Sequence, residues 1–248
     1  MRNAGLRSFV AWATRPSLVL KGIIPLAYGI YLVGFSVSAA VRLAGRHPTL
    51  EDCIMSDLLS PEDNPRGWLI SAVAAVLCGL MLLPTVGLFV RTWRRLDSRW
   101  GVQGVWLYGL GLVSVIATGV STPFQQSYLP IHVYLAFFAF MSLVAGLGIC
   151  LATAVVVCRS SRFRSGAAAA LLLGAFVYLT YVFFTPQYFS GRRWLLGLFE
   201  WILGALIAAG TVSLALLAAE LAEPQESFAQ KSHHPTRRSN ELEPADSL

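Results

Sequence analysis

Charged residues are scarce in this chain. Of its 248 residues, 13% are charged and 56% are hydrophobic, whereas an ordinary soluble domain has roughly a quarter of its residues charged. A chain with so little charge is not expected to fold in water. Its hydrophobic residues come in blocks of about twenty, the length that an α-helix needs to cross roughly 30 Å of hydrocarbon. The sequence therefore predicts an all-α fold and a polytopic integral membrane protein.

Sequence signatures of enzymes and of cofactor sites are also missing. The chain contains no glycine-rich phosphate loop, no His-Glu-x-x-His zinc motif and no Gly-x-Ser-x-Gly nucleophile elbow. Only His47 and His132 lie outside the C-terminal tail, which is too few for a multi-histidine metal site. The four cysteines share no spacing typical of metal ligands. We expect no cofactor and no metal, and an enzyme is the less favoured interpretation.

The few charges that are present mark the ends of six uncharged or nearly uncharged intervals. Between Lys21 and Arg42 lie 20 residues without charge, and between Arg66 and Arg91 lie 24. Each such interval matches one membrane span. The predicted spans of this six-helix bundle lie near residues 22–41, 67–90, 100–122, 133–158, 166–185 and 194–219. Residues 1–20 are predicted to form a lead-in, and residues 220–248, rich in Pro, Ser, Glu and Gln, are predicted to form a disordered tail.

The distribution of Lys and Arg predicts the orientation. The lead-in and the loops on its side of the membrane carry eleven basic residues, and the opposite loops carry five. Cytoplasmic loops are enriched in Lys and Arg, so both termini are predicted to be cytoplasmic. This placement explains the net charge of +6 without nucleic acid, which we exclude as a partner. The pattern fits a plasma membrane, although an endomembrane would give the same distribution.

Small residues recur every four positions in three of the predicted spans, which places them near one face of each helix. Helices in a bilayer associate by close packing of such residues. We therefore expect these faces to be helix contacts, and we expect Leu147 to lie on another face of its helix. The positions are Ser142, Gly146, Cys150, Ala154 and Cys158 in the fourth span, Gly166, Ala170 and Gly174 in the fifth, and Gly204 and Ala208 in the sixth.

Glu200 is the one acid placed inside a predicted span, at roughly 10 Å below the outer end of its helix. Intramembrane ionisable residues are costly and usually face the bundle interior, a cavity or a partner. Glu200 is therefore either a functional group or a hydrogen-bonded lock between two helices. Four other polar residues are assigned to the same outer half, and we expect the acidic first outer loop to roof a polar, ligand-binding pocket. They are Asp57, His132, Arg192 and Arg193.

Three short segments carry a resemblance to a known family. They are the outer loop with Ser56-Asp57, Pro61 and Asn64-Pro65, the His132 that opens the fourth span, and Glu200-Trp201 in the sixth. With these segments in this order, the chain resembles the superfamily of six-span proteins that includes the FGF-receptor-activating-protein and DRAM (damage-regulated autophagy modulator) group and its uncharacterised bacterial relatives. The resemblance implies a six-helix integral membrane protein without established catalysis. Some eukaryotic relatives act in lipid-anchor remodelling or autophagy.

Three functions are compatible with these residues. The favoured one is a non-enzymatic bundle that binds a membrane lipid or a membrane protein partner through the outer loop and the pocket beneath it. The second is a transporter for a small solute or a proton, which would use Glu200. The third is a membrane-embedded lipid hydrolase or transferase, with Asp57, His132 and Glu200 as acid and base groups.

Overall fold

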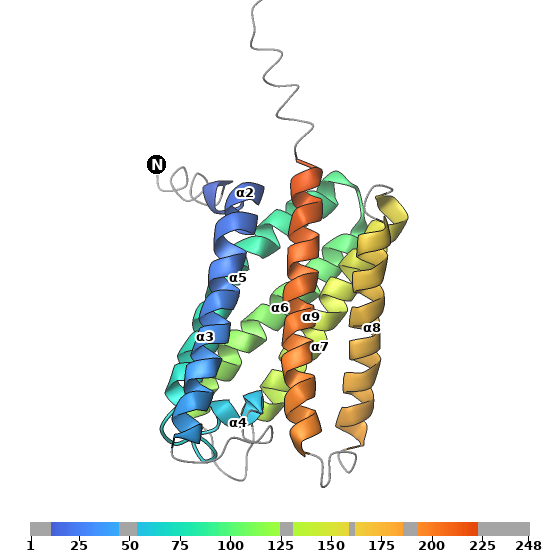
Figure 1. The fold of residues 1–248 in the computed structure, drawn as a ribbon. Coiled ribbons are helices and arrows are strands. Elements are labelled where there is room, and N and C mark those ends of the chain that lie inside the picture. The colour runs from blue at the N-terminus through green and yellow to red at the C-terminus, as the bar shows by residue number, and fades with distance from the viewer. Residues whose placement is uncertain (1–10, 45–53, 125–130, 159–161, 186–192, 223–248) are drawn as a thin grey trace, which may run out of the picture.

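The computed structural model describes residues 11–44, 54–124, 131–158, 162–185 and 193–222. These residues form a bundle of six helices that are long and apolar enough to cross a membrane (Figure 1). The chain is thus a polytopic integral membrane protein with a six-helix bundle. Its long helices are α3 (Ile24–Leu43), α5 (Trp68–Arg95), α6 (Arg99–Ser121), α7 (Ile131–Val157), α8 (Arg162–Phe184) and α9 (Arg193–Glu220).

The first crossing starts earlier than the charge pattern indicates. A short helix, α2 (Pro16–Leu18), and a π-helical turn, η1 (Val19–Ile23), lead directly into α3. Lys21 is therefore part of the helix, where its exposed side chain can reach toward the membrane surface. The π-helical turn ends just before Pro25. A proline lacks the backbone N–H that an α-helix needs, and a π-helical turn is one way to accommodate this loss.

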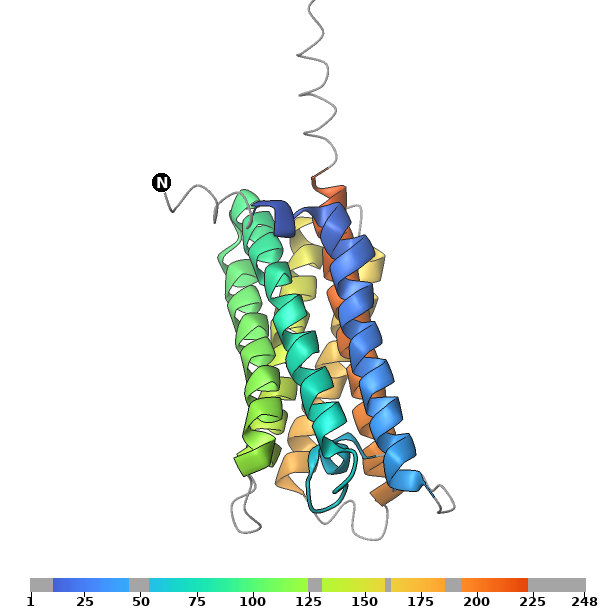
Figure 2. The ribbon, with the colours of Figure 1, turned by 90° about the vertical axis from the view of Figure 1, so that its left-hand side faces the viewer.

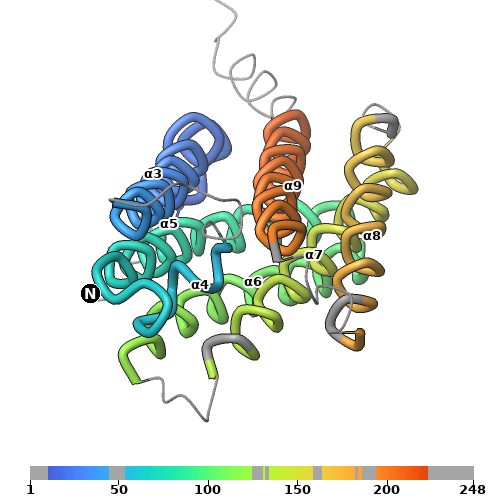
Figure 3. Tube along the Cα trace, turned by 60° about the horizontal axis from the view of Figure 1, so that its bottom comes forward, coloured from blue at the N-terminus to red at the C-terminus, as the bar shows by residue number. Residues whose placement is uncertain are grey.

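The six helices form two layers. Helices α3, α9 and α8 make up one layer, with α9 between the other two, and α5, α6 and α7 lie behind them (Figures 1 and 3). Helices that follow each other in sequence pack on each other, and α9 also packs on α7 and α5. The turned view shows α2 and the end of α9 at the same end of the bundle (Figure 2). Both described ends therefore lie on one side of the membrane, and the cytoplasmic assignment of that side stays a prediction.

The small residues of α7 are a helix contact, as expected. A Cβ atom added to Gly146 would lie 2.4 Å from the backbone nitrogen of Tyr108 on α6. A Cβ on Gly104 of α6 would lie 2.8 Å from the sulfur of Cys150. Both distances are too short for a side chain, so the backbones of α6 and α7 approach each other closely because these positions are glycine.

The expectation about the packing face of α8 is wrong. Ala170 and Gly174 of α8 are exposed, and no atom lies within 4 Å of a Cβ added to Gly174. The buried face of α8 carries Leu172 and Leu179 instead.

Leu147 lies on another face of α7, as expected, because it is next to Gly210 of α9 whereas Gly146 is next to α6. It is nevertheless fully buried, because α7 is covered on more than one face. A spacing of four residues identifies a shared face but does not say which face is buried.

Candidate functional site

A five-residue helix, α4 (Met55–Leu59), lies across the end of the bundle opposite α2 (Figure 1). It contacts α3, α5 and α9. Met55, Leu58 and Leu59 are buried, as their spacing predicts, because residues three and four apart share one face of a helix. The polar residues Ser56 and Asp57 lie between them in the sequence. Helix α4 thus covers the interior of the bundle with an apolar face.

A buried asparagine holds the segment after α4. Asn64 is 1% exposed, and its side-chain nitrogen donates to the hydroxyl of Ser38 at 2.8 Å and to the carbonyl of Leu58 at 3.2 Å. Its side-chain oxygen accepts the backbone N–H of Gly67 at 3.1 Å. The hydroxyl of Ser71 also donates to the Leu58 carbonyl, at 2.6 Å. These bonds join the loop to α3 and α5, so α4 is held in one place.

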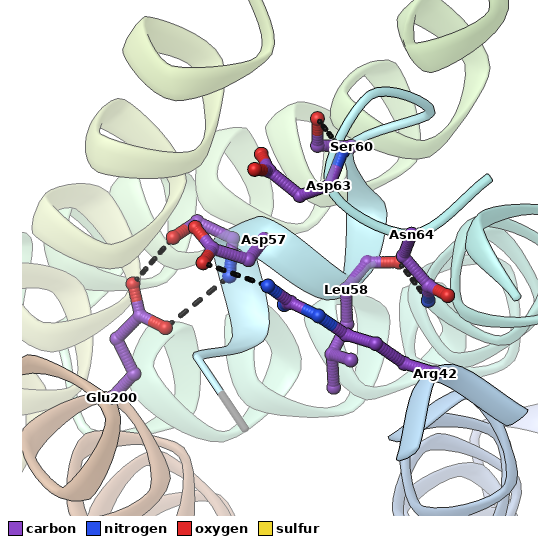
Figure 4. Close-up of polar contacts among 8 residues, drawn as sticks. Arg42, Asp57, Leu58, Ser60, Asp63, Asn64 and Glu200 are labelled. Carbon is purple, nitrogen blue, oxygen red and sulfur yellow. Dashed lines mark hydrogen bonds and ion pairs between the residues drawn. The ribbon is translucent and has the colours of Figure 1, made fainter. Parts of the chain in front are cut away.

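Glu200 of α9 meets the first turn of α4. Its carboxylate accepts the hydroxyl of Ser56 at 3.0 Å and the backbone N–H of Ser56 at 3.2 Å (Figure 4). The first N–H groups of a helix have no partner within that helix. A carboxylate is the strongest acceptor that a side chain offers to such groups. Glu200 therefore acts as a cap for α4, supplied by a helix far away in the sequence.

The other side of α4 is tied to α3. A guanidinium nitrogen of Arg42 lies 3.5 Å from the carboxylate of Asp57, and the two side chains are 13% and 14% exposed. The second terminal nitrogen of Arg42, Nη1, is buried and has no hydrogen-bond partner among the described residues. Figure 4 shows Arg42 and Glu200 approaching α4 from opposite sides. Helix α4 is thus bonded to α3 by an ion pair and to α9 by two hydrogen bonds.

A cavity of about 260 Å³ lies beneath α4. All six long helices contribute to its lining, which is mainly hydrophobic and includes Phe35, Phe137, Phe140 and Leu203. Ser56 and Glu200 line it as well. An apolar cavity of roughly 150 Å³ is already large enough to stay dry and to bind benzene. This space is therefore large enough for part of a hydrocarbon chain.

The expectation of a polar pocket is wrong in one respect, because the lining is mostly apolar. The tyrosines that reach the cavity already have polar partners. The hydroxyl of Tyr28 is bonded to Thr211 at 3.0 Å, and that of Tyr31 donates to the sulfur of Met55 at 3.2 Å. Polar groups are thus paired with the protein itself, and the free space is bounded by hydrocarbon.

The five site residues expected from the sequence do not all come together among the described residues. Glu200 lines the cavity, whereas Asp57 does not and is paired with Arg42. His132 is the second residue of α7 and Arg193 is the first residue of α9. The structure describes the backbone of these two residues but not their side chains. Arg192 is outside the described residues altogether.

Sequence reasoning missed the partners of these residues. In the sequence, Ser56 and Asn64 stand out only through the family resemblance, and Ser38 does not stand out. A serine inside a span and an asparagine before a proline are the signals that could have indicated a buried network, because polar groups inside a membrane protein need partners. Within the described ranges, no group of three or more His, Cys, Asp or Glu residues is arranged to hold a metal ion.

Comparison with protein-family models, with curated proteins and with solved structures gives no match for this chain. The resemblance to the FGF-receptor-activating-protein and DRAM superfamily therefore stays a prediction.

Proposed function

We propose that this protein is a non-enzymatic binder of a membrane lipid, which holds a hydrocarbon chain of the lipid in the cavity beneath α4. The observation that carries the proposal is a hydrophobic cavity of about 260 Å³ inside the bundle, lined by all six long helices. The cavity is covered by α4, which is joined to α3 by an ion pair and to α9 by hydrogen bonds. Pockets for small molecules are typically concave, mostly apolar and equipped with a few polar groups. This cavity has that character.

Hydrophobicity alone does not draw a lipid chain from the bilayer into the protein, because lipid tails are as apolar as leucine. Retention must come from the shape of the cavity and from polar contacts at one of its ends. Ser56 and Glu200 are the polar groups at the side of α4. A lipid with a hydrogen-bonding head group near α4 and one chain in the cavity would satisfy both requirements.

The layer of α3, α9 and α8 offers a lateral route for such a chain. Helix α3 packs on α5, and α9 packs on α7, α8 and α5 and, where the first crossing begins, on α2 and η1. Between α3 and α9, one link is the Tyr28–Thr211 hydrogen bond and another is α4 with its bonds to Arg42 and Glu200. We infer that a lipid chain passes from the bilayer between α3 and α9 when α4 moves.

The two other functions expected from the sequence have less support. A route for a solute or a proton needs a lining of polar groups or water, whereas this cavity is bounded mainly by hydrocarbon. A hydrolase or transferase needs a nucleophile activated by an adjacent base that a third group orients. The hydroxyl of Ser56 does donate to Glu200, but that carboxylate also accepts the N–H of the same residue and so serves the backbone of α4.

The proposal is tested by filling the cavity. Gly204 lines it, and a Cβ added there would meet only the end of the Met55 side chain, at 3.7 Å. Gly204→Leu should therefore project into the cavity and displace a bound chain, whereas Gly174→Leu, on an exposed face of α8, should not. Mass spectrometry of lipids that co-purify from native membranes should find a defined lipid with the wild type and with Gly174→Leu. Equal retention of that lipid by Gly204→Leu would refute the proposal.

A further inference from the structure

The end of the bundle opposite α4 carries a basic face on α5. Arg91, Arg94 and Arg95 are exposed, and together with Gly87 and Val90 they line a hollow in the surface. These positions are three and four residues apart, so they share one face of the helix. We call this surface the α5 basic face.

The charge of the α5 basic face is not neutralised by the described part of the chain. None of its three arginines forms an ion pair with a described residue, whereas Glu220 of α9 is paired with Arg164 at 2.9 Å. Arg91 is held in place, since its guanidinium donates to the buried hydroxyl of Thr14 at 2.9 Å. The residues are arginines and not lysines, and a guanidinium has the fork geometry that matches a phosphate.

The same face continues into the span as hydrocarbon. Leu80 and Leu83 precede Gly87 by seven and four residues, and both are exposed. Helical spacing therefore places two large apolar side chains, the hollow at Gly87 and three guanidinium groups along one face of α5. Insertion of the chain explains why basic residues are frequent at this end. It does not require them to share a face with a hollow and an apolar strip.

We propose that the α5 basic face binds an anionic phospholipid, with the phosphate on the three arginines and an acyl chain along Leu80 and Leu83. Basic pockets next to membrane spans are suited to anionic head groups, and each Lys or Arg near the surface adds to the attraction. The site is separate from the cavity beneath α4, which lies at the other end of the bundle. It also agrees with the predicted orientation, because anionic lipids are concentrated in the cytoplasmic leaflet.

The test compares two double variants that lose the same charge at the same end of the protein. Arg94→Gln/Arg95→Gln removes two groups of the α5 basic face. Arg15→Gln/Arg99→Gln removes two exposed arginines outside it. The purified full-length protein is titrated with phosphatidylglycerol or phosphatidylcholine in mixed micelles, and bound lipid is counted by native mass spectrometry. The wild type should prefer phosphatidylglycerol by about tenfold, and only the first variant should lose this preference.

Three results would overturn the proposal. The first is an equal loss in the two double variants, which would mean that the attraction is diffuse. The second is no preference for the anionic lipid in the wild type. The third is displacement of phosphatidylglycerol by inorganic phosphate alone, which would indicate a phosphate site without a role for the acyl chain. Arg94→Lys/Arg95→Lys keeps the charge and should retain part of the preference for phosphatidylglycerol. Retention by this variant shows that the loss in Arg94→Gln/Arg95→Gln comes from the missing charge and not from misfolding.

Discussion

The carboxylate of Glu200 accepts both the backbone N–H and the hydroxyl of Ser56, at 3.2 and 3.0 Å. An acid within the last span is thus joined to the short helix that covers the bundle. Of the two roles that the sequence allows for Glu200, the structure shows the hydrogen-bonded lock, and the functional role stays a prediction. The residue locks two elements together, and the element that it locks is the cover of a cavity.

The first prediction concerns the strength of this lock. Glu200→Leu leaves the N–H and the hydroxyl of Ser56 without their acceptor, and it should lower the free energy of unfolding by about 1–3 kcal/mol. Glu200→Gln keeps one acceptor oxygen and loses the charge, so its cost should be smaller, about 1 kcal/mol. Thermal unfolding of the purified protein in detergent measures both effects.

Ser56→Ala provides the control for that prediction. If Glu200 acts mainly through the Ser56 hydroxyl and N–H, the effects of Ser56→Ala and Glu200→Gln should not add up in the double variant. Fully additive effects would show that the two residues stabilise the protein independently, and the lock would be rejected.

The second prediction concerns Asn64, which is 1% exposed and makes three hydrogen bonds. Asn64→Ala should destabilise the protein by about 1–3 kcal/mol, since buried polar groups of the loop lose their partner. It should also increase the rate of proteolysis between residues 54 and 67. Asp63→Ala, at the neighbouring exposed position, is the matched control, and a similar increase there would contradict the anchoring role of Asn64.

The third prediction tests the contact between α6 and α7. Gly146→Leu places a side chain against the backbone of Tyr108 and should cost about 1–3 kcal/mol or prevent folding. Gly148→Leu, two residues further along the same helix, should be tolerated because no atom lies within 4 Å of its Cβ position. Equal melting temperatures of the two variants would refute the close approach of these helices.

The fourth prediction tests the orientation. In a protein without reactive native cysteines, a cysteine at the exposed position Glu62 should react with an impermeant thiol reagent in intact cells. A cysteine at the exposed position Arg99 should react only after the membrane is permeabilised. The reverse labelling pattern would show that the termini lie outside.

The six-helix bundle could be predicted from the sequence because insertion into a bilayer depends on local properties. The uncharged interval between Arg66 and Arg91 is long enough for a helix by itself, whatever its neighbours are. Local properties do not predict which face of a helix packs inward, because that depends on the position of the helix in the bundle. For this reason the small residues of α7 were placed correctly and Gly174 of α8 was not.

The candidate site could be predicted only in part. Glu200 stood out because it is an acid inside a span, and the cost of burying a charge is independent of the fold. Its partner Ser56 could not be identified, because the two residues are 144 positions apart and meet only through the fold of the outer loop. The cavity depends on how side chains from six helices fill the space between them, and this packing cannot be predicted from the hydrophobic pattern of the sequence.

The central claim, that a lipid chain occupies the cavity beneath α4, is tested most directly by photo-crosslinking. A lipid with a photoreactive group in its acyl chain is incorporated into membranes that contain the protein, and the labelled peptides are identified by mass spectrometry. The label should be found on lining residues such as Phe137 and Leu203, and Gly204→Leu should remove it from these positions. Labelling confined to exposed residues such as Leu173 and Val177 of α8, unchanged by Gly204→Leu, would contradict the claim.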